Sequence, residues 1–336
     1  MKKILITGGA GYIGSHTAVE LWNAGMEPII LDDFSNSEAK VLDRLEEITG
    51  KRFTFYQGDC NDKTVLDSIG KAHQIEGVIH FAAFKAVGES TAKPLKYYKN
   101  NVGSLVLLLE FMQEQGIKDL VFSSSCTVYG QPEVLPVTEA TPRQEAESPY
   151  GNTKKICEDI LIDYVKSKPG IRVISLRYFN PVGAHPSSKI GELPLGTPNN
   201  LVPFITQVAA GIREKLTVFG ADYDTMDGSC VRDYIHVVDL ADAHVKAFSF
   251  LNQQPENFYD VFNVGTGNGN TVLEVIYAFE KVSGQKLNYV IGPRRPGDVV
   301  KTWADTTKIK TVLGWQPKYS LEDSMRDSWN WQKGLK

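Results

Sequence analysis

The chain has few cysteines, and none lies close enough to another in sequence to suggest a shared metal. Cys60, Cys126, Cys157 and Cys230 form no Cys-x-x-Cys pair, which argues against both a zinc site and a disulfide framework. The six histidines show no metal-binding spacing, and we expect His80, inside an apolar run, to be a core residue rather than a ligand. We therefore expect no bound metal, and reduced thiols as in the cytoplasm.

The chain also lacks an excess of basic residues and any long apolar run. Lysine and arginine total 36 against 40 aspartate and glutamate, a net charge of −4. No basic stretch carries interleaved aromatic residues, so we expect no nucleic-acid partner. No apolar stretch reaches membrane-spanning length, and residues 4–6 are too short for a signal-peptide core. We expect no membrane partner and a cytoplasmic location.

What the chain has instead is a repeated alternation of apolar runs and helical patterns. Its 336 residues, 42% of them hydrophobic, exceed the usual size of one compact domain. The predicted strands are residues 4–7, 29–31, 53–56, 78–83, 120–123 and 173–176, and the predicted helices include residues 95–115, 150–166, 201–210, 271–281 and 320–333. Continuous apolar strands are typical of a parallel sheet covered on both faces. We expect an α/β fold, a doubly wound parallel sheet of the Rossmann type with a smaller C-terminal α/β substrate lobe.

Glycines follow the first predicted strand where a dinucleotide-binding turn requires them. Gly8, Gly11 and Gly14 are spaced by three, and glycines there let the backbone approach a pyrophosphate at a helix N-terminus. Asp32 ends the second predicted strand, roughly twenty residues on, where a carboxylate binds an adenosine ribose and repels a 2′-phosphate. No arginine or lysine follows at residues 33–36. The predicted cofactor is NAD rather than NADP.

Two residues that we expect to end later strands, Asp59 on the third and Lys85 on the fourth, have two interpretations each. Asp59 is in position to bond an adenine amino group, or it is an ordinary turn aspartate. Lys85 is a candidate ligand contact, because ligands gather at the carboxyl ends of parallel strands, or it is a surface lysine. Spacing alone leaves both alternatives open.

Tyr150 and Lys154 lie four residues apart in a predicted helix, after the serines at residues 123–125. This spacing puts both side chains on one helix face. A phenol has a pKa near ~10, and an ammonium one turn away favours the phenolate. Lowering that pKa by ~3 units takes roughly 4 kcal/mol, which Lys154 and a cationic nicotinamide ring could share. The pair alone occurs by chance, but with Ser125 and the glycine loop it predicts that Tyr150 is a base acting on an alcohol.

These features together resemble the extended short-chain dehydrogenase/reductase family. Within that family the chain is similar, from end to end, to the 4-epimerases of UDP-hexoses. The sequence blocks that carry this likeness are His80-Phe81, KAVGES at 85–90, LRYFNPVGA at 176–184, PNNL at 198–201, Gly228 with VRDYIH at 231–236, and WAD at 303–305. The resemblance implies an isomerase that interconverts UDP-glucose and UDP-galactose through a 4-keto sugar with tightly bound NAD.

The resemblance also implies a role for each matching residue. Ser125, Tyr150 and Lys154 match the catalytic set, and these three also contact the cofactor. The other expected NAD contacts are Gly8, Gly11, Tyr12, Ile13, Gly14, Asp32, Asn36, Ser37, Asp59, Cys60, Phe81, Ala82, Ala83, Phe84, Lys85, Asn100 and Phe179. The expected UDP-sugar contacts are Lys85, Ser125, Tyr150, Asn180, Asn200, Leu201, Thr217, Val218, Phe219, Arg232, Arg295, Asp298 and Thr302.

Closely spaced prolines and many glycines after residue 180 predict a second lobe of loops and short elements, and the resemblance implies how the chain assembles. We expect the NAD-binding domain at residues 1–180, with residues 232–265 returning to it, and a mainly UDP-sugar-binding lobe at residues 181–336. A homodimer is implied, paired through the helices at residues 95–115 and 150–166, although those helices could instead be buried within one subunit.

Two positions depart from the family pattern or vary within it. Ala83 stands where the family usually has glycine, which places the backbone near the nicotinamide slightly differently. Thr302 occupies a position where some relatives have a tyrosine that closes the sugar pocket and others a small residue. A threonine leaves room for an N-acetyl group, so we expect UDP-N-acetylglucosamine and its galacto epimer as additional substrates.

The alternatives are a nucleotide-sugar 4,6-dehydratase, a dehydrogenase that releases NADH, and a non-enzymatic NAD-binding regulator. A dehydratase needs an extra acid and base beside the sugar, and in such relatives a carboxylate pair follows the catalytic serine or threonine. Here Cys126 and Thr127 follow Ser125. Retention of Ser125, Tyr150 and Lys154 together argues against a regulator, and a nucleophilic role for Cys126 is the weakest of the alternatives.

Overall fold

A computed structural model describes residues 1–295 and 298–335 of the chain. Its centre is a seven-stranded sheet in the order β11-β6-β5-β4-β1-β2-β3, in which every pairing is parallel. The strands are β1 (Lys3–Thr7), β2 (Glu27–Asp32), β3 (Thr54–Gln57), β4 (Gly77–His80), β5 (Asp119–Ser125), β6 (Arg172–Tyr178) and β11 (Phe258–Val264). The predicted doubly wound α/β fold is confirmed.

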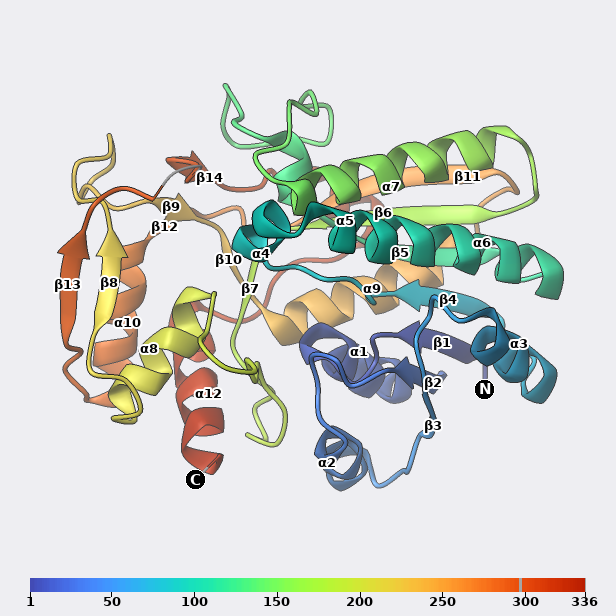
Figure 1. The fold of residues 1–336 in the computed structure, drawn as a ribbon, viewed down its shortest axis with the longest axis horizontal. Coiled ribbons are helices and arrows are strands. Elements are labelled where there is room, and N and C mark those ends of the chain that lie inside the picture. The colour runs from blue at the N-terminus through green and yellow to red at the C-terminus, as the bar shows by residue number, and fades with distance from the viewer. Residues whose placement is uncertain (296–297, 336) are drawn as a thin grey trace.

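Helices cover both faces of this sheet. They are α1 (Tyr12–Asn23), α2 (Lys40–Thr49), α3 (Lys63–Ala72), α4 (Val87–Ala92), α5 (Pro94–Tyr97), α6 (Gly103–Gln115), α7 (Pro149–Lys166), α9 (Val237–Leu251) and α11 (Thr307–Leu313). In Figure 1, α6 and α7 run side by side along one face, and α1 packs with α9 on the other. Successive residues of β1 pack into different hydrophobic cores. Ile4 and Ile6 pack with α1 and α9, whereas Leu5 packs with α3 and α6. Burial on both faces explains why these strands are apolar throughout.

A second lobe lies beside the carboxyl ends of the strands and appears at the left of Figure 1. It contains α8 (Leu201–Ala209), α10 (Val272–Ser283) and α12 (Leu321–Gly334), with the strands β7 (Asn180–Val182), β8 (Leu216–Phe219), β9 (Val231–Arg232), β10 (Tyr234–His236), β12 (Asn270–Thr271), β13 (Tyr289–Gly292) and β14 (Lys301–Thr302). These strands form three small sheets, β10-β7, β12-β9-β14 and β13-β8. The lobe has its own core, which includes Ile205, Ile276 and Met325.

The two parts are tied together at several points. Trp331 of α12 donates a hydrogen bond from Nε1 to the carbonyl of Glu192 at 3.0 Å. The guanidinium of Arg44 in α2 lies 4.9 Å from the centroid of the same ring, within the range of a cation–π contact between the two parts. After the second lobe has begun, the chain also returns to the large sheet through β11.

The sequence placed most elements correctly but was wrong at two of them. The fourth strand ends at His80, not at Ala83. The helix predicted for residues 95–115 is interrupted by a π-helical turn, η1 (Tyr98–Val102), between α5 and α6. Within that turn, the side chain of Asn101 accepts a hydrogen bond from Phe84 N at 2.9 Å and donates one to Phe84 O at 3.0 Å. The side chain thereby fixes the segment after β4 to the helix.

His80 is a core residue, as predicted: it is 2% exposed and its Nδ1 shares a hydrogen bond of 2.7 Å with Thr7 Oγ1. Among the described residues, no helix is both long enough and apolar enough to span a bilayer.

Candidate active site

The glycine loop between β1 and α1 is too tight for side chains. Gly8 has a left-handed conformation with φ of 69°. A Cβ on Gly14 would lie 2.3 Å from the carbonyl oxygen of Gly8. Gly11 is the N-cap of α1 and provides no side-chain hydrogen bond, so the first N–H groups of the helix are available to a phosphate. The loop fits the pyrophosphate of a dinucleotide.

Gly14→Ala is expected to lower NAD affinity by at least about tenfold, because a displaced loop no longer presents its N–H groups to the pyrophosphate. The NAD content of the purified variant, and NAD titration by calorimetry, measure this. Gly88→Ala is the matched control, since a Cβ on Gly88 would meet nothing within 4 Å. Equal NAD content in the two variants would contradict this account of the loop.

Asp32 ends β2 beside this loop, as the sequence predicted. Its carboxylate accepts hydrogen bonds from Ala10 N at 3.0 Å, Phe34 N at 2.9 Å and Ser37 Oγ at 2.7 Å. Burial raises the pKa of Asp32, and these hydrogen bonds oppose the increase. The carboxylate therefore holds the glycine loop and the loop after β2 together, where we expect the adenosine ribose.

Asp59 does not end a strand, because β3 stops at Gln57. It is nevertheless close to another predicted contact residue. Its Oδ1 accepts a hydrogen bond from Asn61 N at 2.8 Å, and Asn61 Nδ2 donates to Asn100 Oδ1 at 3.2 Å. Asn61, which the sequence did not single out, thus connects Asp59 and Asn100 across 41 positions of the chain.

The helix that carries the predicted catalytic pair begins for local reasons that are visible in the sequence. Ser148 caps α7 by accepting a hydrogen bond from Gly151 N at 3.2 Å, and Pro149 occupies the first turn. Tyr150 and Lys154 therefore fall in the first two turns of α7, beside the carboxyl end of the central strands.

Lys154 is directed at the triple serine. It is 5% exposed, and its Nζ donates hydrogen bonds to Ser123 O at 2.6 Å and to Ser123 Oγ at 3.1 Å. Burial lowers the pKa of Lys154 to about 8. Ser125 is the last residue of β5, so the structure brings all three predicted catalytic residues to one edge of the sheet.

The expectation that Lys154 lowers the Tyr150 pKa does not hold for the protein chain alone. Burial raises the pKa of Tyr150 to about 12, and a hydrogen bond with Ser125 offsets only part of that increase. Burial is the largest influence on the Tyr150 pKa, and the hydrogen bonds of the Lys154 ammonium go to Ser123. A cation beside Tyr150 must provide the remaining stabilisation of the phenolate, and the oxidised nicotinamide ring has that charge.

Five predicted substrate contacts lie together in the second lobe. Asp298 accepts hydrogen bonds from Arg295 Nε at 3.2 Å and Nη2 at 2.6 Å, and lies 3.7 Å from Arg232 Nη2. Arg295 also lies over the ring of Phe219, 5.6 Å from its centroid. Thr302 pairs with Arg232 in the register of β14 and β9. Guanidinium groups beside an aromatic ring suit a nucleoside diphosphate.

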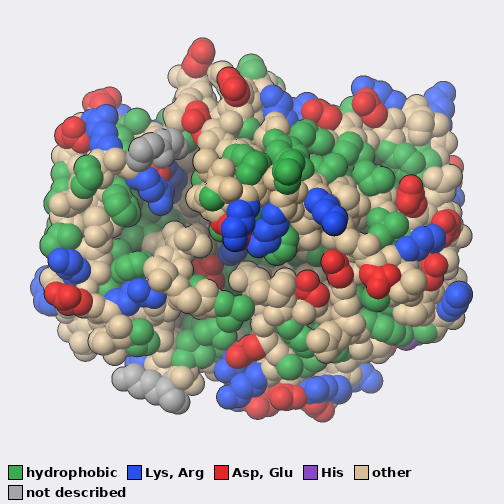
Figure 2. Space-filling model, in the orientation of Figure 1, with side chains coloured by type: hydrophobic (Ala, Val, Ile, Leu, Met, Phe, Trp, Pro, Cys, Tyr) green, Lys and Arg blue, Asp and Glu red, His purple; other side chains and the backbone are tan. Residues whose placement is uncertain are grey.

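Glu192 joins residues from both lobes, and no feature of the sequence pointed to it. Its Oε1 lies 3.2 Å from Lys85 Nζ and accepts a hydrogen bond from Asn200 Nδ2 at 2.6 Å. Lys85 follows β4 and Asn200 precedes α8. In Figure 2 the surface is hollowed between the lobes, and lysine and arginine side chains gather at the rim.

Some predicted contact residues have buried side chains that do not face this hollow. Cys60 is 6% exposed in the core of the large sheet, and Val218 is 1% exposed in the core of the second lobe. Phe179 is also buried, at 4%. Only the backbone of Cys60 and Val218 is therefore positioned to meet a ligand. Asn36 is exposed in the loop after β2, and Leu201 begins α8.

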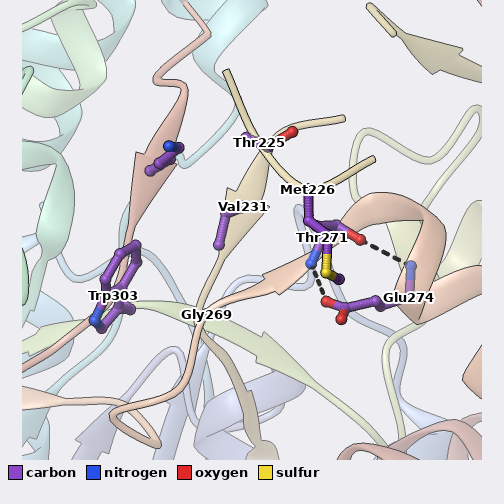
Figure 3. A pocket seen from close by; sticks show the side chains of 8 residues that line it. Thr225, Met226, Val231, Gly269, Thr271, Glu274 and Trp303 are labelled. Atoms are coloured by element: carbon purple, nitrogen blue, oxygen red, sulfur yellow. Dashed lines mark hydrogen bonds between the residues drawn. The ribbon is translucent and has the colours of Figure 1, made fainter. Parts of the chain in front are cut away.

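The cavity of about 250 Å³ shown in Figure 3 lies behind this site. It is lined by Val231, the neighbour of Arg232, and by Trp303, the neighbour of Thr302, and adjacent strand residues face opposite sides of a sheet. Two of its polar residues are already partnered, because Glu274 and Thr271 bond each other's backbone N–H at 2.7 and 3.0 Å. We therefore place the active site on the opposite face of the β12-β9-β14 sheet.

Comparisons with a family model, with related sequences and with solved structures each match nearly the whole chain. A family model described as GDP-mannose 4,6 dehydratase matches residues 5–328. The UDP-glucose 4-epimerase of Bacillus subtilis is 54% identical over 330 residues, covering 98% of this chain and 96% of the relative. The crystal structure of a UDP-glucose-4-epimerase from Stenotrophomonas maltophila, with bound NAD and formylated UDP-arabinopyranose, superposes with a TM-score of 0.97 at 46% identity and covers 100% and 99% of the two chains. A UDP-Glc/GlcNAc 4-epimerase from Campylobacter jejuni gives a TM-score of 0.85 at 37% identity, covering 99% and 100%.

Proposed function

Because this chain belongs to the UDP-glucose 4-epimerases of the extended short-chain dehydrogenase/reductase family, we propose that it interconverts UDP-glucose and UDP-galactose with NAD as cofactor. The observation that carries this function is the convergence of Ser125, Tyr150 and Lys154 at the carboxyl end of the central strands, beside a glycine loop shaped for a pyrophosphate. The isomerase reaction needs one base at one carbon, and Tyr150 provides it.

In this mechanism Tyr150, as the phenolate, takes the proton of the sugar 4-hydroxyl, and Ser125 bonds the same oxygen. Bound NAD supplies the hydride chemistry, accepting the C4 hydrogen and returning it. Lys154 remains a buried cation close to Tyr150 and, we infer, also bonds the nicotinamide ribose. Because the reaction has no net redox change, the cofactor is expected to stay bound through turnover.

The 4-keto sugar must present its other face before the hydride returns. The pocket therefore has to grip the nucleotide firmly and the sugar loosely. Arg232, Arg295 and Asp298, which meet beside Phe219, are proposed to hold the uridine diphosphate. Lys85 and Asn200, which are joined through Glu192, are also proposed to contact the substrate.

The residues after Ser125 disfavour the dehydratase alternative, although the matching family model has a dehydratase name. Cys126 and Thr127 begin the turn η2 (Cys126–Tyr129), and neither is a carboxylate. Burial raises the pKa of the Cys126 thiol to about 12, so it is a poor base or nucleophile at neutral pH. Elimination at the sugar lacks its catalysts here.

We also propose that the N-acetylated pair of UDP-hexoses is accepted. Thr302 is partly buried in β14, in register with Arg232, so it lies beside the group that we assign to the diphosphate. Its side chain is short compared with a tyrosine at the same position, which leaves space where an acetamido group would lie.

The assembly and the location that we propose are a homodimer in the cytoplasm. The faces of α6 and α7 carry Val106, 41% exposed, with Ile160 and Tyr164 partly exposed, which suits packing against a second copy. All four cysteines are free thiols, which suits a reducing compartment. Sedimentation of the purified protein tests the dimer.

The experiment that tests the function is incubation of the purified protein with UDP-galactose, and separately with UDP-N-acetylgalactosamine, without added NAD. We expect UDP-glucose and UDP-N-acetylglucosamine as products, with no steady growth of NADH absorbance. A 4-keto-6-deoxy product would identify a dehydratase, and accumulating NADH a net dehydrogenase.

A further inference from the structure

Glu158 of α7 and Arg177 of β6 form the most buried ion pair among residues 1–295 and 298–335. Glu158 is 0% exposed and Arg177 is 4% exposed. Arg177 donates from Nε to Oε1 at 2.9 Å and from Nη2 to Oε2 at 2.7 Å. A two-point pair of this kind fixes orientation as well as distance.

The same carboxylate holds the strand that carries the catalytic serine. Ser124 Oγ donates to Glu158 Oε1 at 2.6 Å. Ser124 lies between Ser123, which accepts the hydrogen bond from Lys154, and Ser125. One buried carboxylate therefore connects α7, β5 and β6 at the end where the catalytic residues are.

Arg177 extends these contacts to the turn that follows Ser125. Its Nη1 donates to Tyr129 Oη at 2.8 Å, and Tyr129 Oη donates to Asn263 Oδ1 at 2.6 Å. Tyr129 is the last residue of η2, which begins directly after Ser125, and Asn263 lies in β11. The segments on both sides of Ser125 are thus fixed to the same ion pair.

On α7, Glu158 follows Lys154 by one turn, and Lys154 follows Tyr150 by one turn, so the three side chains share a helix face. We propose that Glu158 is a positioning residue for epimerisation: through Arg177 and Ser124 it sets the spacing between Tyr150 and Lys154 on α7 and Ser125 on β5. The proposal rests on the proposed function. Because Glu158 is fully buried, it acts through these neighbours and not on the substrate.

The chain contains a matched comparison for this role. Asp119 of β5 and Arg172 of β6 form another ion pair, 2.6 Å long, between the two strands that Glu158 contacts through Ser124 and Arg177. In the register of β5 and β6, Asp119 pairs with Arg172 and Ser124 pairs with Arg177. The pair of Ser124 and Arg177 lies five residues along the strands from the pair of Asp119 and Arg172, which corresponds to about 16 Å. Loss of the Asp119 pair therefore weakens the same strand pair far from the catalytic residues.

The experiment compares Glu158→Gln, Ser124→Ala and Asp119→Asn, each measured for melting temperature and for kcat and KM with UDP-galactose. We expect kcat to fall about 100-fold in Glu158→Gln, because small displacements of reacting groups have effects of that size. We expect kcat to fall about fivefold in Ser124→Ala and less than about twofold in Asp119→Asn. KM is expected to stay nearly unchanged in all three variants.

A merely structural Glu158 would give a different pattern. In that case kcat per folded enzyme would follow melting temperature, so that Asp119→Asn and Glu158→Gln variants of equal stability would be equally active, and the proposal would be overturned. If Glu158→Gln does not fold, Ser124→Ala tests the proposal instead, because this variant keeps the ion pair between Glu158 and Arg177. An unchanged kcat in Ser124→Ala would overturn the proposal. Failure of the proposed function is distinct, since the unmodified protein would then not epimerise UDP-galactose.

Discussion

Tyr150→Phe is expected to fold, to keep its NAD and to lose about 10³-fold in kcat, within the usual range for removal of a general base. The substitution deletes one oxygen and keeps the ring, so packing against the carboxyl end of the sheet is preserved. The phenol of Tyr150 is the group that we propose takes the proton of the 4-hydroxyl, and phenylalanine has no group that could replace it. Single-turnover kinetics with UDP-galactose measure the loss at the chemical step.

Tyr164→Phe is the matched control, because Tyr164 lies on the same helix and bonds only Gln113 of α6, at 3.0 Å. Activity close to that of the unmodified protein is expected for this control. If Tyr150→Phe retained epimerisation within a few-fold of the unmodified enzyme, Tyr150 would not be the base.

Thr302→Tyr is expected to reduce turnover of the N-acetylated UDP-hexoses by about 100-fold or more, while UDP-galactose turnover changes only a few-fold. The added ring fills the space beside Arg232, to which Thr302 is paired in the sheet, and a crowded site rejects the larger substrate. The ratio of kcat/KM for the two substrates is the measurement.

Thr302→Ser is its control and is expected to leave that ratio unchanged, because serine is no larger than threonine. Should the unmodified protein fail to turn over the acetylated pair, or should Thr302→Tyr leave the ratio as it was, the pocket argument would be wrong.

Features set by local sequence were the ones that the sequence predicted well. The glycine spacing has a local cause, because Gly8 has a left-handed φ and a Cβ on Gly14 would contact the carbonyl oxygen of Gly8, six residues earlier. Helix α7 begins at its own Ser148 and Pro149, so the face that carries Tyr150 could be read from spacing. Continuous apolar runs similarly predicted the parallel sheet.

The sequence did not predict, or predicted wrongly, the features that depend on the tertiary fold. The π turn η1 contains Asn101, whose side chain bonds Phe84, 17 residues earlier. Glu192 joins Lys85 to Asn200 across the lobes, and no periodic pattern marks such a residue. Glu158 was within reach of the sequence, because it continues the four-residue spacing of Tyr150 and Lys154, but only the fold shows its partner Arg177.

The Tyr150 pKa shows the same limit in electrostatic terms. Helical spacing places an ammonium near the phenol, but it does not reveal that Ser123 accepts that ammonium's hydrogen bonds. Sequence spacing therefore predicted which candidate catalytic side chains the fold brings together, but not how charge is shared among them.

The most direct test of the central claim, that one hydrogen leaves and returns to the same sugar carbon without meeting water, is isotopic. UDP-galactose labelled with deuterium at C4 is converted in ordinary water, and the UDP-glucose formed is analysed by mass spectrometry and NMR. The account predicts that the deuterium is retained at C4 of the product. Loss of the label to solvent would contradict it.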